Sequence, residues 1–156
     1  MMKMRKWLIS QSAKRAPDVV IGGHENPYLM RWWLIPRNPF FNIYLHWFLR
    51  SDDDRAHHDH PWLNASWLLE NEYLEHRILA GGIHQKILRK AGDFAFRLSG
   101  KIAHRIELQN GPCWTLFITG PRYRRWGFHC ENNGWVHWKD FTASDDPGAI
   151  GKGCDQ

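Results

Sequence analysis

Short runs of β-branched and aromatic residues, separated by turn-forming dipeptides, dominate the chain from about Pro27 onward. The runs are Tyr28–Ile35, Asn42–Leu49, Ala65–Glu70, Glu72–Leu79, Ile83–Arg89, Phe94–Leu98, Ile102–Leu108, Cys113–Thr119 and Trp135–Trp138. Between runs stand Gly81-Gly82, Asn110-Gly111 and Asn133-Gly134, which supply the positive φ angles of tight hairpins. Many short strands at even spacing indicate a sandwich or a small barrel. We therefore expect an all-β fold.

The chain length allows a single domain. Its 156 residues are 43% hydrophobic and 24% charged, a globular composition with room for one core. We expect a basic N-terminal arm over residues 1–26, a β-domain over 27–142 and a mobile tail over 143–156. The tail is expected because this stretch contains almost no apolar residues.

Membrane and secreted classes are not favoured by the sequence. No uncharged apolar stretch approaches the ~18 residues of a membrane span, and no signal-peptide core of ~7–15 apolar residues follows the basic N-terminus. Cys113, Cys130 and Cys154 form no CxxC pair and leave one odd thiol, so a disulfide scaffold is not expected. We expect a cytoplasmic protein with reduced thiols and no membrane partner.

The net charge of +5 is concentrated at the N-terminus. Residues 1–17 contain no acidic residue and five basic ones, namely Lys3, Arg5, Lys6, Lys14 and Arg15, whereas the rest of the chain is balanced. Such an arm is typical of a solvated, partly helical extension. An alternative is a nucleic-acid or assembly partner that binds through residues 1–17 and Arg122–Arg125.

One histidine falls on the apolar side of a predicted strand. Side chains alternate along Ile102–Leu108, so His104 shares a face with Ile106 and Leu108, while Arg105 faces the other way. A buried imidazole needs a hydrogen-bond partner or a metal. By itself, such a histidine is more often a hydrogen-bonded core residue than a metal ligand.

A His-x-His pair precedes this region. His58 and His60 are two residues apart, so on an extended segment both rings point the same way and can hold one ion. Acidic neighbours that could orient a ligating ring flank them, namely Asp52, Asp53, Asp54 and Asp59. Together with His104, the pair predicts a metal site.

At these residues the chain resembles the cupin superfamily, RmlC-like small barrels whose first motif carries His-x-His and whose second carries a later histidine. The first motif corresponds to His58 and His60; the second corresponds to the stretch from Gly92 through Gly100 to His104. The usual glutamate of the first motif would fall near Asn64. The resemblance implies a double-stranded β-helix, or jelly-roll barrel, and a homodimer.

Without that glutamate, the resemblance implies a centre of three neutral imidazoles, similar to those of cupin dioxygenases. The implied cofactor is a divalent transition metal, with Fe(II) preferred and Zn, Ni or Mn as alternatives. The implied activity is an Fe(II)-dependent dioxygenase acting on a small anionic molecule. The alternative is a non-catalytic or isomerase/epimerase-like cupin that binds a sugar or nucleotide-sugar.

A competing alignment of the same segment stays open. His57 and Asp59, with His104, would form a two-histidine, one-carboxylate triad. A shift of one residue exchanges the faces of a strand, so only one alignment can apply. We prefer His58 and His60 because Trp62 then joins their face.

Two further residues are candidate catalytic groups. On Asn42–Leu49, Tyr44 shares a face with His46 and precedes Arg50; Tyr44 could donate a proton and Arg50 could clamp a substrate carboxylate. The same face could instead be the half-exposed side of a strand. Glu75 could replace the missing glutamate, but the more apolar face of its strand is the opposite one, so we expect Glu75 to point outward.

Overall fold

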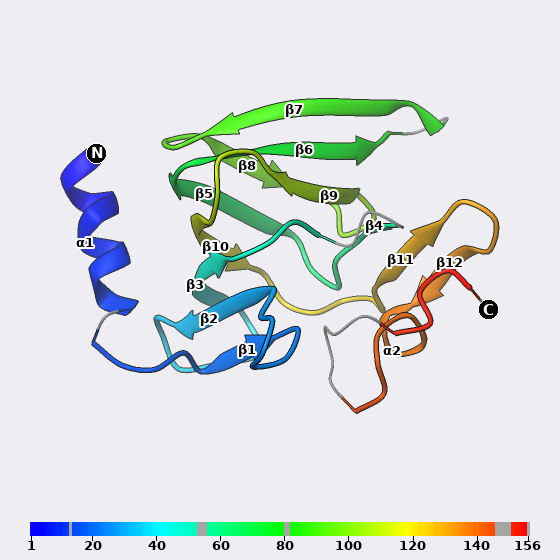
Figure 1. Ribbon diagram of the computed structural model, residues 1–156, viewed down its shortest axis with the longest axis horizontal. Helices are drawn as coiled ribbons and strands as arrows, with labels where there is room; N and C mark the ends of the chain where they lie inside the picture. Colours follow the sequence, from blue (N-terminus) through cyan, green and yellow to red (C-terminus); the bar gives the residue numbers. More distant parts are fainter. Residues whose placement is uncertain (13, 53–55, 80–81, 146–150, 156) are drawn as a thin grey trace.

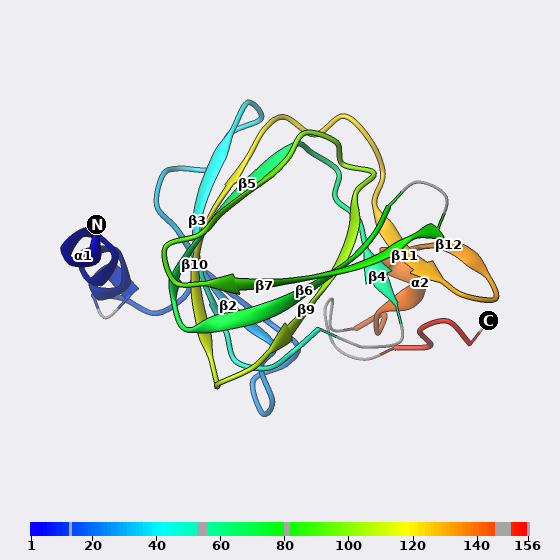
Figure 2. The same cartoon turned by 90° about the horizontal axis from the view of Figure 1, so that it is seen from above.

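Two six-stranded antiparallel sheets face each other in the computed structural model, which describes residues 1–12, 14–52, 56–79, 82–145 and 151–155 (Figures 1 and 2). The first sheet has the order β1 (Val19–Ile21), β2 (Leu29–Trp33), β3 (Asn42–Phe48), β10 (Cys113–Thr119), β5 (Asn64–Glu70), β8 (Phe94–Arg97). The second has the order β12 (Gly134–His137), β11 (Gly127–Cys130), β4 (His57–His58), β9 (Ala103–Leu108), β6 (Glu72–Ile78), β7 (His84–Lys90). The predicted all-β barrel is confirmed.

Each of the predicted runs contains a strand whose ends lie within two residues of those expected. Three strands were missed, namely β1, β4 and β11. They are short: β4 has only two residues and lies between β11 and β9. A two-residue strand carries no periodicity of its own, so its conformation depends on the partners on either side.

Two of the predicted turn dipeptides connect strands: Gly111 adopts a φ of 97° between β9 and β10, and Gly134 adopts a φ of 66° where β12 begins. Asn71, where no turn was predicted, adopts a φ of 63° between β5 and β6. The Gly92-Asp93 turn places Gly92 at a φ of 112°, and Asp93 accepts a hydrogen bond from the backbone N–H of Lys90 at 2.9 Å. This turn leads directly into β8, at the start of the stretch that corresponds to the second motif. Gly81 of the Gly81-Gly82 pair lies outside the described residues.

Apolar side chains form two separate clusters. Between the two sheets lies a cluster to which both contribute, formed by Leu29, Phe48, Leu68, Tyr73, Ile106 and Cys113. On the outer face of the first sheet lies a tryptophan-rich layer formed by Trp32, Leu45, Trp67, Leu69 and Trp114. The helix α1 (Met2–Ser12) packs Leu8 and Ile9 onto this layer, and Figure 2 shows it outside the barrel. The first sheet therefore buries apolar side chains on both of its faces.

The N-terminal segment joins the barrel through more than α1. β1 pairs with β2 in the first sheet, so the sheet begins inside the segment that we expected to be an arm. Arg15 forms an ion pair with Asp18 at 2.7 Å and donates a hydrogen bond to the carbonyl of Trp33 at 2.8 Å. At least one of the basic residues of this segment therefore has a partner within the chain. The helices of the described residues include none long and apolar enough to cross a membrane.

The C-terminal segment is tied to the second sheet by a disulfide between Cys130 of β11 and Cys154. This corrects the expectation that the cysteines do not pair; the odd thiol is Cys113, which is buried. The N–H of Gly153 also donates to the carbonyl of Phe141 in the short helix α2 (Trp138–Phe141) at 3.0 Å. Spacing could not reveal the bond, because 24 residues separate the two cysteines and only the β11–β12 hairpin brings them together.

Removal of a buried leucine side chain tests the outer apolar layer. Leu45 has no exposed surface and contacts this layer, whereas Leu98 is 81% exposed. We expect Leu45→Ala to lower the free energy of unfolding by about 2–5 kcal/mol, and Leu98→Ala to change it by less than about 0.5 kcal/mol. Urea unfolding monitored by circular dichroism measures both. Equal losses would show that α1 and the first sheet do not pack as described.

Candidate metal centre

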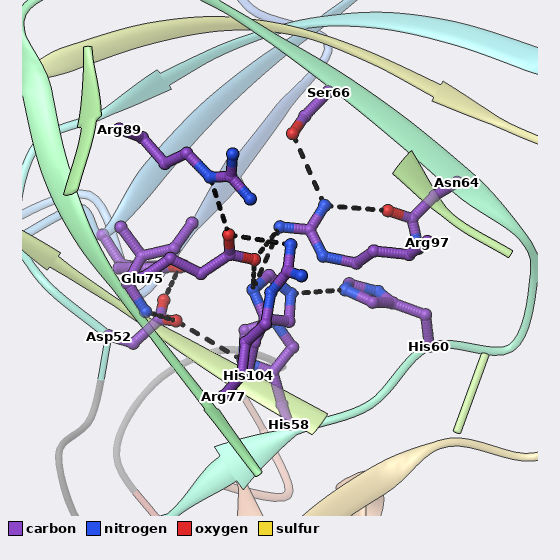
Figure 3. Close-up of polar contacts among 12 residues, drawn as sticks. Asp52, His58, His60, Asn64, Ser66, Glu75, Arg77, Arg89, Arg97 and His104 are labelled. Atoms are coloured by element: carbon purple, nitrogen blue, oxygen red, sulfur yellow. Dashed lines mark hydrogen bonds and ion pairs between the residues drawn. The ribbon is translucent and has the colours of Figure 1, made fainter. Parts of the chain in front are cut away.

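Three histidines from two distant segments converge inside the barrel (Figure 3). His58 ends β4, His60 follows two residues later, and His104 lies on β9 directly opposite His58 in the β4–β9 pair. One ring nitrogen from each histidine lies within 4.8 Å of those of the other two. The Nε2 atoms of His60 and His104 are 2.8 Å apart. The three predicted ligands are therefore brought together.

The backbone around Gly100 holds His60 in place. The His60 N–H donates to the Gly100 carbonyl at 3.0 Å, and Nη1 of Arg124 donates to the carbonyls of both residues at 3.1 Å. A Cβ atom on Gly100 would lie 2.4 Å from the His60 carbonyl oxygen and 2.8 Å from the Tyr123 hydroxyl. Only glycine allows this close approach of two chains. The glycine of the second motif thus positions a ligand of the first.

Two buried carboxylates orient two of the rings. Oε1 of Glu75 lies 3.2 Å from Nδ1 of His104, and Oδ2 of Asp52 lies 3.4 Å from Nδ1 of His58. A proton on each Nδ1 facing a carboxylate leaves the Nε2 lone pair free to bind a metal. Asp52 is itself held by the Tyr28 hydroxyl and by the N–H of Ile106. The prediction that flanking acids orient the rings thus applies to Asp52; Asp53 and Asp54 lie outside the described residues.

Glu75 is fully buried, which corrects the expectation that it points outward. Its carboxylate pairs with Arg97, with Arg77 at 2.9 Å and with Arg89 at 3.0 Å (Figure 3). Burial alone would raise the pKa of Glu75, but the hydrogen bond with His104 and the charge of Arg97 hold this pKa far below its usual range. In the sequence, the Glu75 face of β6 looked polar, because the strand by itself does not show how the carboxylate is neutralised. The three arginines that neutralise Glu75 lie on three different strands.

The histidine rings are neutral at physiological pH. Burial is the main cause, and the charge of Arg97 adds to it, so that the pKa of His104 falls to about 4. Burial and the neighbouring imidazoles hold the pKa values of His58 and His60 well below the usual range. Neutral imidazoles are the form in which histidine binds a metal.

A cavity of about 300 Å³ opens next to the histidines. Its walls are largely apolar, with Phe48, Ile106, Phe117 and Phe128, but they also include Arg31 and Arg97. The ring centroid of Phe117 lies 5.8 Å from that of His60 and 5.2 Å from that of His46. The cavity therefore has the size and lining of a small-molecule site.

The alternative triad of His57, Asp59 and His104 is not formed. His57 points to the outer side, where its ring lies 5.8 Å from that of His84. Asp59 is buried against β11 instead, where it accepts hydrogen bonds from the Gly127 N–H at 2.9 Å and from Trp135 at 3.1 Å. The alternation of a strand explains the outcome, because His58 facing inward forces its neighbours outward.

The two candidate catalytic groups lie in different places. Arg50 lines the cavity but is partly exposed; its guanidinium lies 5.5 Å from the Tyr28 ring centroid. Tyr44 is buried and does not line the cavity; its ring stacks on His46 at 5.8 Å, and the Arg31 guanidinium lies over it at 4.9 Å. The prediction that this face of β3 turns toward a binding cavity is correct for His46. The roles of Tyr44 and Arg50 stay predictions.

Sequence reasoning missed the buried Arg97. On β8, Ala95 and Arg97 face inward while Phe94 and Phe96 are 50% and 65% exposed. Hydrophobicity would place the phenylalanines inside and the arginine outside. The arrangement is reversed because Glu75, Asn64 and Ser66 supply acceptors for Arg97 within the barrel.

No family model matches the sequence, and no curated protein matches it either. Solved structures do match the fold. Fe(II) HppE in complex with substrate aligns at 15% identity with a TM-score of 0.53, over 68% of this chain and 57% of that chain. Hydroxypropylphosphonic acid epoxidase from S. wedmorenis aligns at 16% identity with a TM-score of 0.51, over 67% and 57%.

Oxalate decarboxylase from Bacillus subtilis, described with Mn(II) centres, aligns at 14% identity with a TM-score of 0.52, over 74% of this chain and 30% of that chain. The matched part is thus less than two thirds of each of these proteins. The likeness confirms the expected cupin-like barrel at the level of the fold.

Filling the space at Gly100 tests the contact that positions His60. Because a Cβ atom there would overlap the His60 carbonyl, we expect Gly100→Ala to lower the free energy of unfolding by about 1–3 kcal/mol. Gly120→Ala is the matched control, since its Cβ would meet Leu63 at ordinary distances of 3.7 Å and 3.9 Å. Urea unfolding measures the difference. A tolerated Gly100→Ala would contradict the close approach of the two segments.

The stability of the fold should depend on pH through its buried histidines. Burial, aided by the charge of Arg31, holds the pKa of His46 well below its usual range in the folded state. The unfolded chain therefore binds the proton first as the pH falls below about 6.5, and stability is lost on the acid side. We expect the free energy of unfolding to fall between pH 6.5 and 5.5, and His46→Gln to reduce this fall by about 1 kcal/mol.

Urea unfolding at pH 7.5, 6.5 and 5.5 measures this slope. His24→Gln is the control, because His24 is exposed in a loop. If the two variants change the slope equally, His46 is not the buried neutral group described.

Proposed function

We propose that this protein is a metal-dependent oxygenase that binds Fe(II) through His58, His60 and His104 and oxidises a small anionic molecule. The observation that carries the proposal is the convergence of three neutral imidazoles at one wall of the cavity. Ligands at about 2.1 Å from an ion must themselves lie roughly 3 Å apart, and the Nε2 atoms of His60 and His104 lie 2.8 Å apart.

The donor set fits a transition metal. Imidazole suits Fe, Zn, Ni and related ions, and three protein ligands leave further positions open for water or substrate. Glu75 and Asp52 lie behind two of the rings, where they fix the tautomer and add negative charge near a cation. Fe(II), when bound in such a site, supplies the one-electron and O₂ chemistry that side chains lack.

The protein's own contribution is binding, orientation and exclusion of water. The apolar walls, such as Phe117 and Phe128, hold a substrate in a poorly hydrated space beside the histidines. The arginines of the cavity give it a positive potential that attracts anions. Arg97 lies next to His104, with its Nη2 3.3 Å from Nδ1, and keeps Glu75 ionised and in position.

Three of the structural neighbours support this proposal. One is an Fe(II) protein in complex with substrate, and another is a Mn(II) decarboxylase. A third is an epoxidase named for a phosphonic acid, which is a small anion. They favour metal-dependent chemistry on a small acid here. The homodimer and the cytoplasmic location stay predictions.

A second candidate is a cupin that binds a sugar or nucleotide-sugar without oxidising it. The observation that favours it is the indole wall of the cavity: Trp62, Trp126 and Trp138 line it, and the rings of Trp126 and Trp138 stack at 5.6 Å. Indole rings stack readily on sugars and bases. This candidate and the oxygenase differ in whether the protein consumes O₂.

Metal content tests the site. After incubation with Fe(II) under anaerobic conditions and removal of excess ion, we expect about one equivalent in the wild-type protein by elemental analysis. His58→Ala and His104→Ala should retain little metal, because each removes one of three ligands. His57→Ala is the matched control and should keep the metal, since His57 faces the outer side. Loss of metal in His57→Ala, or none in the wild type, would refute the site.

An oxygen electrode tests the reaction with the same Fe(II)-loaded proteins. We expect O₂ uptake on addition of some member of a panel of small carboxylic acids, thiols and diketones, and none in His104→Ala. A metal-loaded wild-type protein that takes up no O₂ with any of them, yet binds a sugar nucleotide in calorimetry, would favour the second candidate.

A further inference from the structure

Arg31 presents a charged group to the cavity from the wall formed by the first sheet. It lies on β2 opposite His46 of β3, and its Nε donates to Nε2 of His46 at 2.8 Å. The guanidinium lies over the Tyr44 ring, 4.9 Å from its centroid. The stacked ring and the hydrogen bond hold the guanidinium in one orientation. Within the described residues, its Nη1 and Nη2 atoms make no hydrogen bond and can therefore donate to a ligand.

The charge of Arg31 is not balanced by a carboxylate in the described part of the chain. The two carboxylates nearest the cavity are already engaged: Glu75 binds Arg97, Arg77 and Arg89, and Asp52 lies beside His58. Burial lowers the pKa of Arg31 to about 10, so the guanidinium still carries its charge at neutral pH. A desolvated cation without a counterion is costly unless a ligand supplies one.

A second donor on the cavity wall also lacks a partner. The indole Nε1 of Trp62 is buried and has no hydrogen-bond acceptor within the described residues, although Trp62 lines the cavity. A buried donor without an acceptor is unfavourable. The wall of this largely apolar cavity thus contains a guanidinium without a carboxylate partner and a buried N–H without an acceptor, both of which favour a ligand that carries a hydrogen-bond acceptor.

Phe117 lies between the Arg31–His46 pair and the three histidines. Its ring centroid lies 5.2 Å from that of His46 and 5.8 Å from that of His60. A ligand that reached from the guanidinium to the histidines would therefore lay its middle part on an aromatic ring. The cavity volume of about 300 Å³ limits this ligand to a small molecule.

We propose that Arg31 is the anchor for the carboxylate of a small, largely apolar monocarboxylic acid, whose body packs on Phe117 and whose far end faces His58, His60 and His104. The planar Nη1–Nη2 edge matches the two oxygens of a carboxylate. The inference deepens the proposed function and rests on it for the role of the histidines. It names the substrate class and assigns the anion to Arg31.

Arg50, which the sequence suggested for this role, is placed less favourably. Both arginines are half-buried, but the Nε of Arg50 reaches the carbonyl of Asn26 at 3.4 Å in an exposed contact, whereas the contact of Arg31 with His46 is partly buried. Solvent weakens an exposed pair of charges. Arg31 holds its guanidinium in the interior wall, where a charge-assisted hydrogen bond is stronger.

Calorimetric titration of the full-length protein with benzoate tests the anchor. Benzyl alcohol is the neutral probe of matched shape, and phenylphosphonate tests whether a tetrahedral anion is preferred. The variants are Arg31→Gln, Arg31→Lys and Arg50→Gln, with Arg37→Gln as an exposed control whose guanidinium lies over Trp33. Each titration is made with chelator-treated protein and again with Zn-loaded protein, because zinc occupies the histidines without redox chemistry.

We expect wild-type protein to bind benzoate more tightly than benzyl alcohol and phenylphosphonate. Arg31→Gln should weaken benzoate binding about 10- to 100-fold, while Arg50→Gln and Arg37→Gln change it less than about threefold. Arg31→Lys keeps the charge but loses the flat edge, so it should weaken binding several-fold even if Arg31→Gln does not fold. The preference for carboxylate should persist in the chelator-treated protein.

Other outcomes overturn the inference. These are no benzoate binding by the wild-type protein, equal binding of benzyl alcohol, tighter binding of phenylphosphonate, or a larger loss in Arg50→Gln than in the Arg31 variants. The proposed function fails separately if zinc does not bind to the three histidines while benzoate binding still depends on Arg31. Conversely, if the protein binds metal but its benzoate affinity does not change in the Arg31 variants, only the assignment of Arg31 as the anchor is refuted.

Discussion

A buried carboxylate connects the two sheets to the candidate metal centre. Glu75 of β6 contacts His104 of β9 at 3.2 Å and pairs with Arg97 of β8, which belongs to the opposite sheet. A charge in the barrel interior is tolerable only when it is neutralised and fully hydrogen-bonded. Because its partners come from both sheets, Glu75 places β8 and β9 relative to each other. The orientation of His104 follows from that placement.

The side chains of the segment from His57 to His60 face both sides of the second sheet. His58 and His60 face the cavity, whereas Asp59 faces β11 and accepts hydrogen bonds from Gly127 and Trp135. The carboxylate of Asp59 thereby holds the β11–β12 hairpin against the same short strand that carries the ligands. Displacement of the hairpin would therefore disturb the histidines as well.

Much of the scaffold could be read from residue patterns. The alternation of β9 placed His104 inside correctly, and the runs of β-branched and aromatic residues located nine of the strands. β1 and β4 were not predicted because two or three residues carry too little periodicity, and β11 was not predicted although it is as long as β8 and β12. The Cys130–Cys154 disulfide was not predicted, because the sequence separation of two cysteines does not determine their spatial distance in a hairpin-rich fold.

The sequence by itself determined the all-β class and the inward side of His104, because both depend on local alternation, and the resemblance of its histidine motifs indicated the barrel. Only the tertiary structure decided that Glu75 and Arg97 lie inside and that Arg31 faces the cavity. Local hydrophobicity assigns a charged side chain to water. The burial of these charges depends on partners from other strands, and those partners meet only when the two sheets close around them.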